Sequence, residues 1–414
     1  MTGTPRRVRI GLFGLFGVRN LGNEATLAAA MAGLRARADV DFVLVSSPLA
    51  AGSALPEFKV QIEPDLLPVM YRAWPGVPSR WKAGWGGFAQ RATEPLRRRR
   101  TRAAVRAFDM LLVPGTGIAD DFGQGPYDAP HHLARWSEVV RDHGGKVAYA
   151  SIGAGPASHP LSRRWFGDAL RAAHYRSYRE PGSKAFATEI GVDTSRDPVM
   201  PDMVFSLPHP GGEAPRVTWP PRTVALGVMS YKGWNVSGPA ADEIYATYLK
   251  KMVSLTGQLL DMGLTVRLLI GNRGSDVKTV RHLREALSPH PLAASGLVAS
   301  DIQTHDDVLR EIGASDLVIA ARFHNILKAV LLGRPAISIS YARKNDELLK
   351  EMDLAGYCHP IEQFDPARIV EQVRQLSAMS NPPTATVERR VTEYRVALAA
   401  QFDRLIDLAR PREG

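Results

Sequence analysis

The chain has 414 residues, of which 45% are hydrophobic and 23% are charged, and its formal net charge at pH 7 is +10. This composition excludes a disordered or low-complexity polymer, and the length predicts about two or three domains. The single cysteine, Cys358, excludes an internal disulfide framework and a cysteine-built zinc site, which favours a reducing compartment such as the cytoplasm.

The chain has no segment that is typical of membrane insertion or secretion. The longest apolar candidate, residues 317–340, is interrupted by two arginines, a histidine and a lysine, so it falls short of the roughly 20 apolar residues that span a bilayer. Near the N-terminus, the apolar stretch 10–18 is short, rich in glycine and without a cleavage site of small residues. We therefore expect a cytoplasmic protein without a membrane span.

The first domain is predicted from short β-rich apolar runs that alternate with helical patterns, which is typical of βα units in a mostly parallel sheet. The fold class is therefore α/β. The predicted strands are 8–14, 41–46, 110–114, 146–152 and 176–178, and the predicted helices are 24–36, 131–142 and 162–173.

Positive charge is concentrated in residues 72–106, which carry ten arginines and lysines against one acid and account for +9 of the net charge. Trp74, Trp81 and Trp85 are interleaved with them, a mixture that predicts contact with an anionic membrane at its cytoplasmic face. We expect no nucleic-acid partner, because no helix-turn-helix, zinc-finger or RNA-recognition pattern accompanies the segment. A solvated segment without a partner, or a lid, is the alternative.

The second half of the chain repeats the α/β pattern after a break. Five prolines and two glycines in residues 207–222 exclude regular structure and mark a linker. The linker separates an N-terminal domain, 1–206, from a C-terminal domain, 223–383, and residues 384–414 are expected to pack back onto the first domain. The predicted strands are 224–229, 265–270, 317–320 and 336–340, and the predicted helices are 241–262, one that ends near 332, and 384–409.

Three predicted strands of the first domain end in loops rich in glycine. Because the carboxyl ends of parallel strands share one edge of a sheet, we expect these loops to surround one binding site for an anion. A tight turn is the alternative for the first loop. The loops contribute Asn20, Gly22, Asn23 and Glu24, then Gly115 and Gly117, and then Gly153 and Gly155.

Basic residues follow three other predicted strands. Arg179 suits a phosphate or a carboxylate through its planar fork, with an ion pair to a neighbouring carboxylate as the alternative. In Arg322-Phe-His324-Asn325, the histidine is a candidate general acid, with a structural histidine as the alternative. Lys344 adds a third cation at the same edge. Together these residues predict an anionic substrate.

One further turn, at Asn272, is a candidate loop for a sugar or a nucleotide, with a plain turn as the alternative. The sequence contains no nucleophile elbow, no P-loop and no zinc-binding pair of histidines. We therefore expect neither a metal nor another cofactor.

In this order, the segments resemble the polysaccharide pyruvyl transferase family over residues 8–353. Asn23 stands where the family usually has an aspartate, and Thr116 stands where a third glycine is common. The resemblance is carried by Asn20-Leu-Gly22-Asn23-Glu24, Gly115-Thr-Gly117, Ser151-Ile-Gly153-Ala-Gly155-Pro156, Tyr178-Arg179-Glu180 with Ser183, Asp202 with Phe205, Arg322-Phe-His324, and Gly333-Arg-Pro335 with Tyr341 and Lys344.

The resemblance implies a GT-B-like fold, in which two Rossmann-type domains face each other across a cleft. It also implies transfer of the pyruvyl group of phosphoenolpyruvate to a saccharide or lipid-linked glycan, with a pyruvate ketal as the expected product. Asp202 or Glu24 is the candidate base for the acceptor. We assign catalysis to His324, donor binding to Arg179, Arg322, Lys344, Gly153, Gly155 and Asn325, and acceptor binding or loop formation to Asn20, Gly22, Asn23, Glu24, Gly115, Gly117, Asp202 and Asn272.

Two other functions are compatible with the same residues. A GT-B glycosyltransferase that uses a nucleotide sugar has the same architecture and also needs a basic site for a diphosphate. A protein without enzymatic activity that binds anions or nucleic acid through Arg97–Arg106 is the second alternative.

Overall fold

The structure is a computed structural model that describes residues 7–46, 58, 60–62, 79–121, 125–213, 215–233, 236–382 and 384–410. The chain forms two compact units. Unit 1 consists of Met1–Val18, Thr26–Ser206 and Val396–Gly414, and unit 2 consists of Arg19–Ala25 and Leu207–Arg395.

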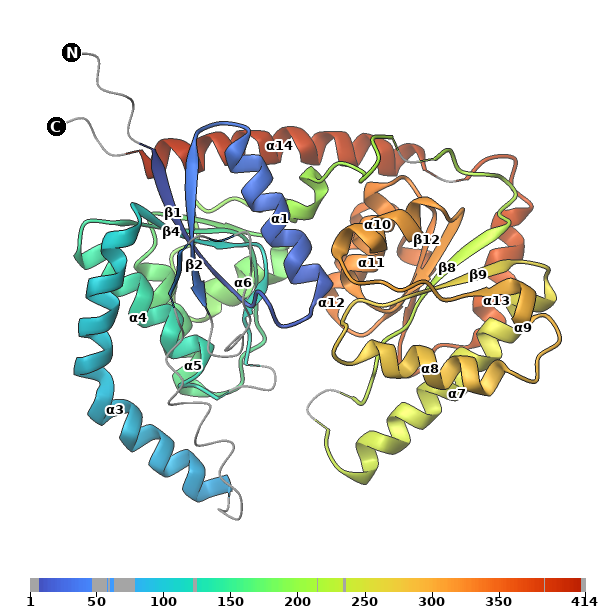
Figure 1. The fold of residues 1–414 in the computed structure, drawn as a ribbon, viewed down its shortest axis with the longest axis horizontal. Coiled ribbons are helices and arrows are strands. Elements are labelled where there is room, and N and C mark those ends of the chain that lie inside the picture. Colours follow the sequence, from blue (N-terminus) through green and yellow to red (C-terminus); the bar gives the residue numbers. More distant parts are fainter. Residues whose placement is uncertain are drawn as a thin grey trace. The chain divides into compact units, whose positions relative to one another are not determined.

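Unit 1 is built on a parallel sheet with the strand order β3-β2-β1-β4-β6, in which β6 also pairs with β5 and β7 (Figure 1). The pairings between these strands are all parallel. Every residue of β4 is buried, as expected for a strand covered on both faces. The strands are β1 (Val8–Gly14), β2 (Val40–Ser46), β3 (Val60–Ile62), β4 (Met110–Pro114), β5 (Gly117–Ala119), β6 (Lys146–Ala154) and β7 (Tyr175–Tyr178).

The helices of unit 1 include the last part of the chain. The Phe402 ring occupies the place that a Cβ atom on Gly33 would take, so the final helix packs closely on the first. Gln401 is buried and forms hydrogen bonds with Ser151 and Ser177. The helices are α1 (Leu21–Arg35, in unit 1 from Thr26 onward), α3 (Ser79–Ala104), η2 (Val105–Ala107), α4 (Ala129–Asp142), α5 (Pro160–Arg171), α6 (Pro181–Glu189), η3 (Met203–Ser206) and α14 (Ala385–Ala409, in unit 1 from Val396 onward).

Unit 2 has a second parallel sheet, with the strand order β10-β9-β8-β11-β12-β13. Its central strand β11 is completely buried, so the α/β fold class predicted from the sequence is confirmed in both units. The strands are β8 (Thr223–Gly227), β9 (Thr265–Leu269), β10 (Leu297–Val298), β11 (Leu317–Ala320), β12 (Ala336–Ser340) and β13 (Cys358–Pro360). The helices are α7 (Pro239–Asp261), α8 (Asp276–Leu287), α9 (Ala293–Gly296), α10 (His305–Gly313), α11 (Phe323–Leu331), α12 (Arg343–Glu351), η4 (Ala355–Tyr357) and α13 (Pro366–Ser377).

The described part of residues 207–222 contains no helix and no strand, as its prolines predict. The Asp316 carboxylate accepts hydrogen bonds from the amides of Thr218, Arg222 and Thr223 at 2.8, 3.0 and 3.0 Å. These bonds hold the segment on unit 2, of which it forms part.

The segment 72–106 contains a long helix that the sequence analysis did not predict. α3 covers its larger part, whereas residues 72–78, including Trp74, lie outside the described residues. Arginine, alanine and glutamine are good helix formers, and they outweigh the glycines and the proline in this stretch. Arg97 and Thr101, one helical turn apart, are buried, and Arg98 forms an ion pair with Glu138 of α4. Packing against α4 therefore orders a segment whose composition suggests exposed surface.

Candidate functional site

Two neighbouring strands of unit 2, β11 and β12, each lead directly into a helix. The N-cap residues of α11 and α12, Arg322 and Ala342, form no side-chain capping bond within the described part of the chain. The amides of an uncapped helix start carry partial positive charge and bind anions. Arg322 and Lys344 add one formal cation to each helix start.

The Arg322 guanidinium is oriented by Asp276, the first residue of α8. Nε and Nη2 of Arg322 donate hydrogen bonds to the two carboxylate oxygens of Asp276 at 3.0 and 2.6 Å. Burial acts to lower the pKa of Arg322, but the Asp276 carboxylate raises this pKa above its usual value, so the guanidinium stays charged. Asp276 also accepts the amide hydrogens of Gly271 and Asn272 at 3.0 and 2.8 Å, which ties the turn after β9 to Arg322.

Residues 19–25 follow β1 in the sequence but belong to unit 2, where they pair with the turn after β9. The Leu21 amide donates to the Gly271 carbonyl at 3.0 Å. Asn20 and Asn272 form an antiparallel bridge. Two loops that are 250 residues apart in the sequence therefore meet at one place, beside Arg322.

His324 lies against the first turn of α1. A Cβ atom on Gly22 would lie 2.2 Å from Nδ1 of His324, so only glycine allows this close approach. Oδ1 of Asn20 accepts hydrogen bonds from the amides of Gly22 and Asn23 at 3.0 and 3.4 Å and caps the start of α1. The predicted catalytic histidine and the first predicted glycine loop are thus brought together.

Lys344 and Asn325 lie in different surroundings. Nζ of Lys344 is 5.5 Å from the centroid of the Phe323 ring and 5.1 Å from that of Tyr341, which are cation–π distances. Asn325 is only 2% exposed, and its Nδ2 atom lies 2.8 Å from where a Cβ on Gly227 would be. Asn325 therefore fills the interior of unit 2 at the end of β8.

The sequence analysis did not select two charged residues of this region, Asp276 and Lys328. Lys328 lies one helical turn after His324, is 1% exposed, and donates from Nζ to the His305 carbonyl at 3.1 Å. Burial lowers its pKa to about 7, although the negative charges of Asp306 and Glu24 oppose this shift. A single lysine within the apolar run of α11 is the sequence signal that identifies it.

Arg179 lies in unit 1 and is enclosed by carboxylates. Its Nε donates to Glu180 at 2.8 Å and its Nη1 donates to Asp202 at 3.0 Å. Burial opposes the charged form of Arg179, but the two carboxylates raise its pKa well above the usual value. Gly153 leaves room for this arrangement, because a Cβ there would lie 2.7 Å from Nη2 of Arg179. The ion-pair alternative for Arg179 is confirmed, and the candidate base Asp202 is one of its partners.

The glycine loops of unit 1 use their backbone within the sheet. The amides of Gly153 and Gly155 donate to carbonyls of the neighbouring chain segment around β5 at 3.0 and 2.8 Å. Gly115 has a positive φ of 21° and is therefore a tight turn. Among the described residues, a Cβ on Gly117 would meet only Asp120, at 3.5 Å. Ligand binding by these glycines stays a prediction.

The structure divides the predicted site residues between the two units. Unit 2 brings Asn20, Gly22, Asn23, Glu24, Asn272, Arg322, His324, Asn325 and Lys344 together around the starts of α1 and α11. Unit 1 contains Gly115, Gly117, Gly153, Gly155, Arg179 and Asp202.

Comparison with family models decides the classification. The model described as "Polysaccharide pyruvyl transferase" matches residues 20–343, which is most of the chain. The chain belongs to the polysaccharide pyruvyl transferase family. The match begins at Asn20 and includes Arg322 and His324, so the resemblance seen in the sequence is confirmed and the protein is classed as a transferase.

Solved structures similar to this pyruvyl transferase family member show the same fold at low sequence identity. The UDP-GlcNAc 2-epimerase from Methanocaldococcus jannaschii has a TM-score of 0.53 and 10% identity, and the match covers 94% of this chain and 99% of that one. Anabaena HepE in complex with UDP-glucose has a TM-score of 0.55 and 12% identity, with 97% and 100% covered. The predicted GT-B-like class is therefore confirmed. A search of curated proteins gives no significant match.

The described ranges contain no group of three or more His, Cys, Asp or Glu residues that is arranged to hold a metal ion. No helix within these ranges has both the length and the hydropathy that a membrane span needs.

Proposed function

We propose that this protein transfers the pyruvyl group of phosphoenolpyruvate to hydroxyl groups of a saccharide or glycolipid and forms a pyruvate ketal during synthesis of a cell-surface glycan. The reaction takes place in the cytoplasm and uses no metal or other cofactor. Phosphoenolpyruvate is the donor substrate, and the family supports a saccharide as the acceptor.

One observation carries the proposal: two neighbouring helix starts, at α11 and α12, each bear a cation, Arg322 or Lys344. Phosphoenolpyruvate has a phosphate and a carboxylate close together, so two adjacent positive positions suit its two charges. The Asp276 carboxylate binds two of the guanidinium nitrogens of Arg322, Nε and Nη2, and leaves Nη1 outside these bonds. Arg179 as a further donor-binding residue stays a prediction.

His324 is the residue that we assign to proton transfer. It protonates the methylene carbon of the enol, and the electrons of the double bond form the new C–H bond. The central carbon becomes cationic, and a hydroxyl of the acceptor attacks it and loses its proton to a base. The bond between this carbon and the phosphate oxygen then breaks, and its electron pair leaves with the phosphate. A second hydroxyl of the same sugar attacks the carbon, gives its proton to His324 and closes the ketal.

Of the two candidate bases for the acceptor, Glu24 is the better supported. Asp202 accepts hydrogen bonds from Arg179 and from the Val204 amide and is 1% exposed, so it is committed to a buried ion pair. Glu24 is in the first turn of α1, two residues after the glycine that contacts His324. We therefore assign the acceptor proton to Glu24.

The test is release of inorganic phosphate from phosphoenolpyruvate by the purified full-length protein, in the presence of candidate saccharide acceptors. We expect His324→Ala to lower the rate by about 100-fold or more, because proton transfer by a placed side chain typically contributes that much. His290→Ala, a substitution at the distant α8–α9 connection, is the matched control and should keep the rate. Mass analysis of the acceptor identifies the bond that forms.

A nucleotide-sugar glycosyltransferase is the second candidate function, because the solved structures of similar fold include complexes with UDP-glucose and with UDP-GlcNAc. Incubation with UDP-sugars distinguishes the two. Turnover of a UDP-sugar with no phosphate release from phosphoenolpyruvate would replace our proposal with this candidate.

A further inference from the structure

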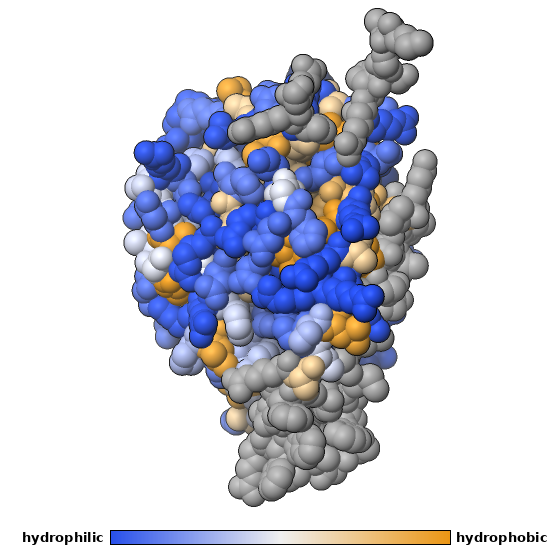
Figure 2. Space-filling model, turned by 90° about the vertical axis from the view of Figure 1, so that its left-hand side faces the viewer, coloured by the Kyte–Doolittle hydropathy of each residue, from blue (hydrophilic) through white to orange (hydrophobic). Residues whose placement is uncertain are grey.

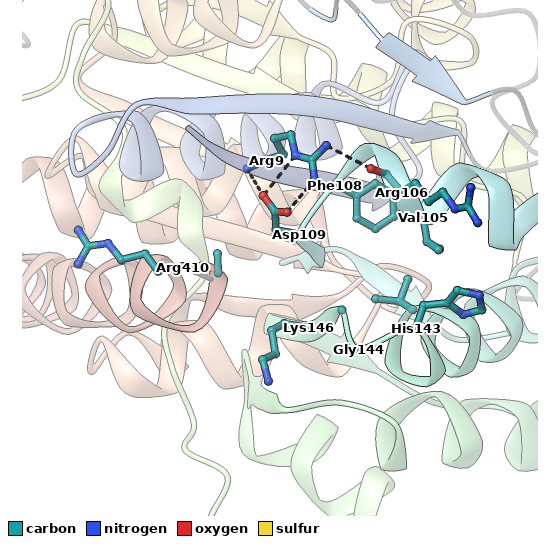
Figure 3. Close-up of a pocket in the computed structure, with 12 residues that line it drawn as sticks. Arg9, Val105, Arg106, Phe108, Asp109, His143, Gly144, Lys146 and Arg410 are labelled. Carbon is teal, nitrogen blue, oxygen red and sulfur yellow. Dashed lines mark hydrogen bonds and ion pairs between the residues drawn. The ribbon is translucent and has the colours of Figure 1, made fainter. Parts of the chain in front are cut away.

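Unit 1 contains a second candidate binding site at the amino ends of its strands. A half-open pocket of about 520 Å³ lies where β1, β4 and β6 begin, next to the end of α14 (Figure 3). The glycine loops of unit 1 follow the opposite, carboxyl ends of the same strands. At about 3.3 Å per residue, the 7 residues of β1 separate the two edges by about 20 Å. The pocket is therefore distinct from the predicted catalytic edge.

The rim of the pocket is positively charged. Five of its lining residues are cations or histidine, and its one acid, Asp109, is already bound by Arg9 through hydrogen bonds of 3.3 and 2.8 Å. Arg106 is exposed and Lys146 is partly exposed, and neither forms an ion pair with a carboxylate within the described residues. Figure 3 shows their side chains on different sides of the hollow, with the charged ends directed away from each other. Two uncompensated cations thus border one open pocket.

The inner wall of the pocket is apolar. Val105, Phe108, Val140 and Ala409 line it, and each of them is less than a tenth exposed. A polar, charged rim above an apolar wall fits a ligand that combines an anionic head with an apolar body. Inorganic phosphate alone has no group that would contact this wall.

The positive charge continues from the pocket along α3. Arg99, Arg100 and Arg102 are exposed and form no ion pair within the described residues, and one turn before them Leu96 is 52% exposed. The face of unit 1 at the left of Figure 1 is mostly hydrophilic, with small separate hydrophobic patches (Figure 2). Arg99, Arg100 and Arg102 extend the cationic area beyond the pocket, which suits a charged surface better than a single small molecule.

We propose that this pocket and the C-terminal end of α3 form a docking site for an anionic phospholipid bilayer, in which Arg106 and Lys146 each contact headgroup phosphates. The contact is carried by residues of the loops between α3 and β4 and between α4 and β6, in addition to the basic helix. The glycine loops then lie on the side of unit 1 that faces away from the bilayer.

An anionic membrane explains the features better than nucleic acid does. The helix that continues the cationic area contains Trp81 and Trp85 in its sequence, and its described part exposes Leu96. Basic residues together with tryptophan and leucine on one helix are typical of helices that lie in the membrane interface. Nucleic acid would need the positive charge alone, and it would leave the apolar wall of the pocket without a partner.

The test is flotation of the full-length protein with two kinds of vesicle, phosphatidylcholine alone and phosphatidylcholine mixed with phosphatidylglycerol. We expect flotation only with the anionic vesicles, and less of it as the salt concentration rises. The double substitution Arg106→Ala, Lys146→Ala should lower the partition coefficient by about 25-fold, because each basic residue near an anionic surface contributes roughly fivefold. Arg106→Glu with Lys146→Glu should abolish flotation.

A matched variant controls for net charge. Lys278→Glu with Arg284→Glu reverses two exposed charges on α8 in unit 2 and should float like the wild type. Thermal unfolding of each variant shows that it is folded. Equal flotation of the two reversal variants, or equal flotation with neutral vesicles, overturns the proposal. So does retention of single-stranded DNA through Arg106 and Lys146 without any flotation, which would assign the surface to nucleic acid.

Discussion

Arg179 in unit 1 and Arg322 in unit 2 have the same predicted role but very different surroundings. Arg179 is shared by two carboxylates, Glu180 and Asp202. Arg322 is bound by one carboxylate, Asp276, so the pair is neutral, and it stands at a helix start next to a second cation-bearing helix. The side chain of Arg179 is 6% exposed and that of Arg322 is 20% exposed.

This difference shows that an arginine at the end of a strand is available to a ligand only if few carboxylates reach it. The Glu180 and Asp202 carboxylates bind Nε and Nη1 of Arg179. Arg322 keeps one guanidinium nitrogen, Nη1, outside its bonds to Asp276. Unit 2 is therefore the better candidate for binding the anionic donor.

The largest expected effect is on the free energy of unfolding, which should fall more when Arg179 is replaced than when Arg322 is replaced. Arg179→Met should lower the free energy of unfolding by about 3–5 kcal/mol, because it leaves the buried Asp202 carboxylate without its cation. Arg322→Met should cost clearly less, since Asp276 keeps the hydrogen bonds from the Gly271 and Asn272 amides. Urea denaturation of the two variants measures both values. Equal losses of unfolding free energy in the two variants would contradict the proposed difference between Arg179 and Arg322.

The next effect concerns Lys328, the buried cation of unit 2 that can lose its proton. Its pKa is about 7 in the folded chain and near 10.5 when unfolded, so the unfolded state binds more protons between these values and stability rises with pH across this window. Lys328→Met should remove this rise. From pH 7 to pH 9 the wild type should gain about 2 kcal/mol relative to the variant in urea denaturation. If the free energies of unfolding of the two proteins change with pH in the same way, the lowered pKa of Lys328 is wrong.

A smaller effect tests the contact between Gly22 and His324. Gly22→Ala places a methyl group against the imidazole ring and should lower kcat/KM by about tenfold, which is roughly 1.4 kcal/mol. Gly356→Ala is the matched control, because a Cβ there meets no described residue within 4 Å. Phosphate release from phosphoenolpyruvate is the assay. An unchanged rate for Gly22→Ala would show that the position of His324 does not depend on this loop.

The smallest effect on stability is expected at Lys344, which contacts aromatic rings and has no carboxylate partner within the described residues. Lys344→Met should change the free energy of unfolding by about 1 kcal/mol, because Lys344 is only partly buried and a cation–π contact that stays accessible to water contributes about that much. Its KM for phosphoenolpyruvate should nevertheless rise several-fold. A large loss of stability with an unchanged KM would make Lys344 a structural residue.

The central strands could be predicted from the sequence because each is a short apolar run between polar segments. β4, β11 and β12 have the predicted limits, Met110–Pro114, Leu317–Ala320 and Ala336–Ser340. The edge strands β3, β10 and β13 have only two or three residues, too few for a pattern. α3 escaped prediction because its buried positions, such as Arg97, are polar, and burial is then decided by the partner helix.

The candidate site could be predicted as a set of residue types but not as a set of contacts. Arg322 and His324 follow a buried strand, and this position is readable from the chain itself. Their partners Asp276 and Gly22 lie 46 and 302 residues away in sequence from them. Nothing in the local pattern near either partner indicates which side chain it will meet.

By itself, the sequence determined the α/β class, the succession of buried strands and the family motifs, because hydrophobic periodicity and short-range order depend on neighbouring residues. Only the tertiary structure decided which carboxylates neutralise which arginines, and that residues 19–25 join unit 2. The physical reason is that charge compensation and close approach act through space, over distances that the chain order does not encode.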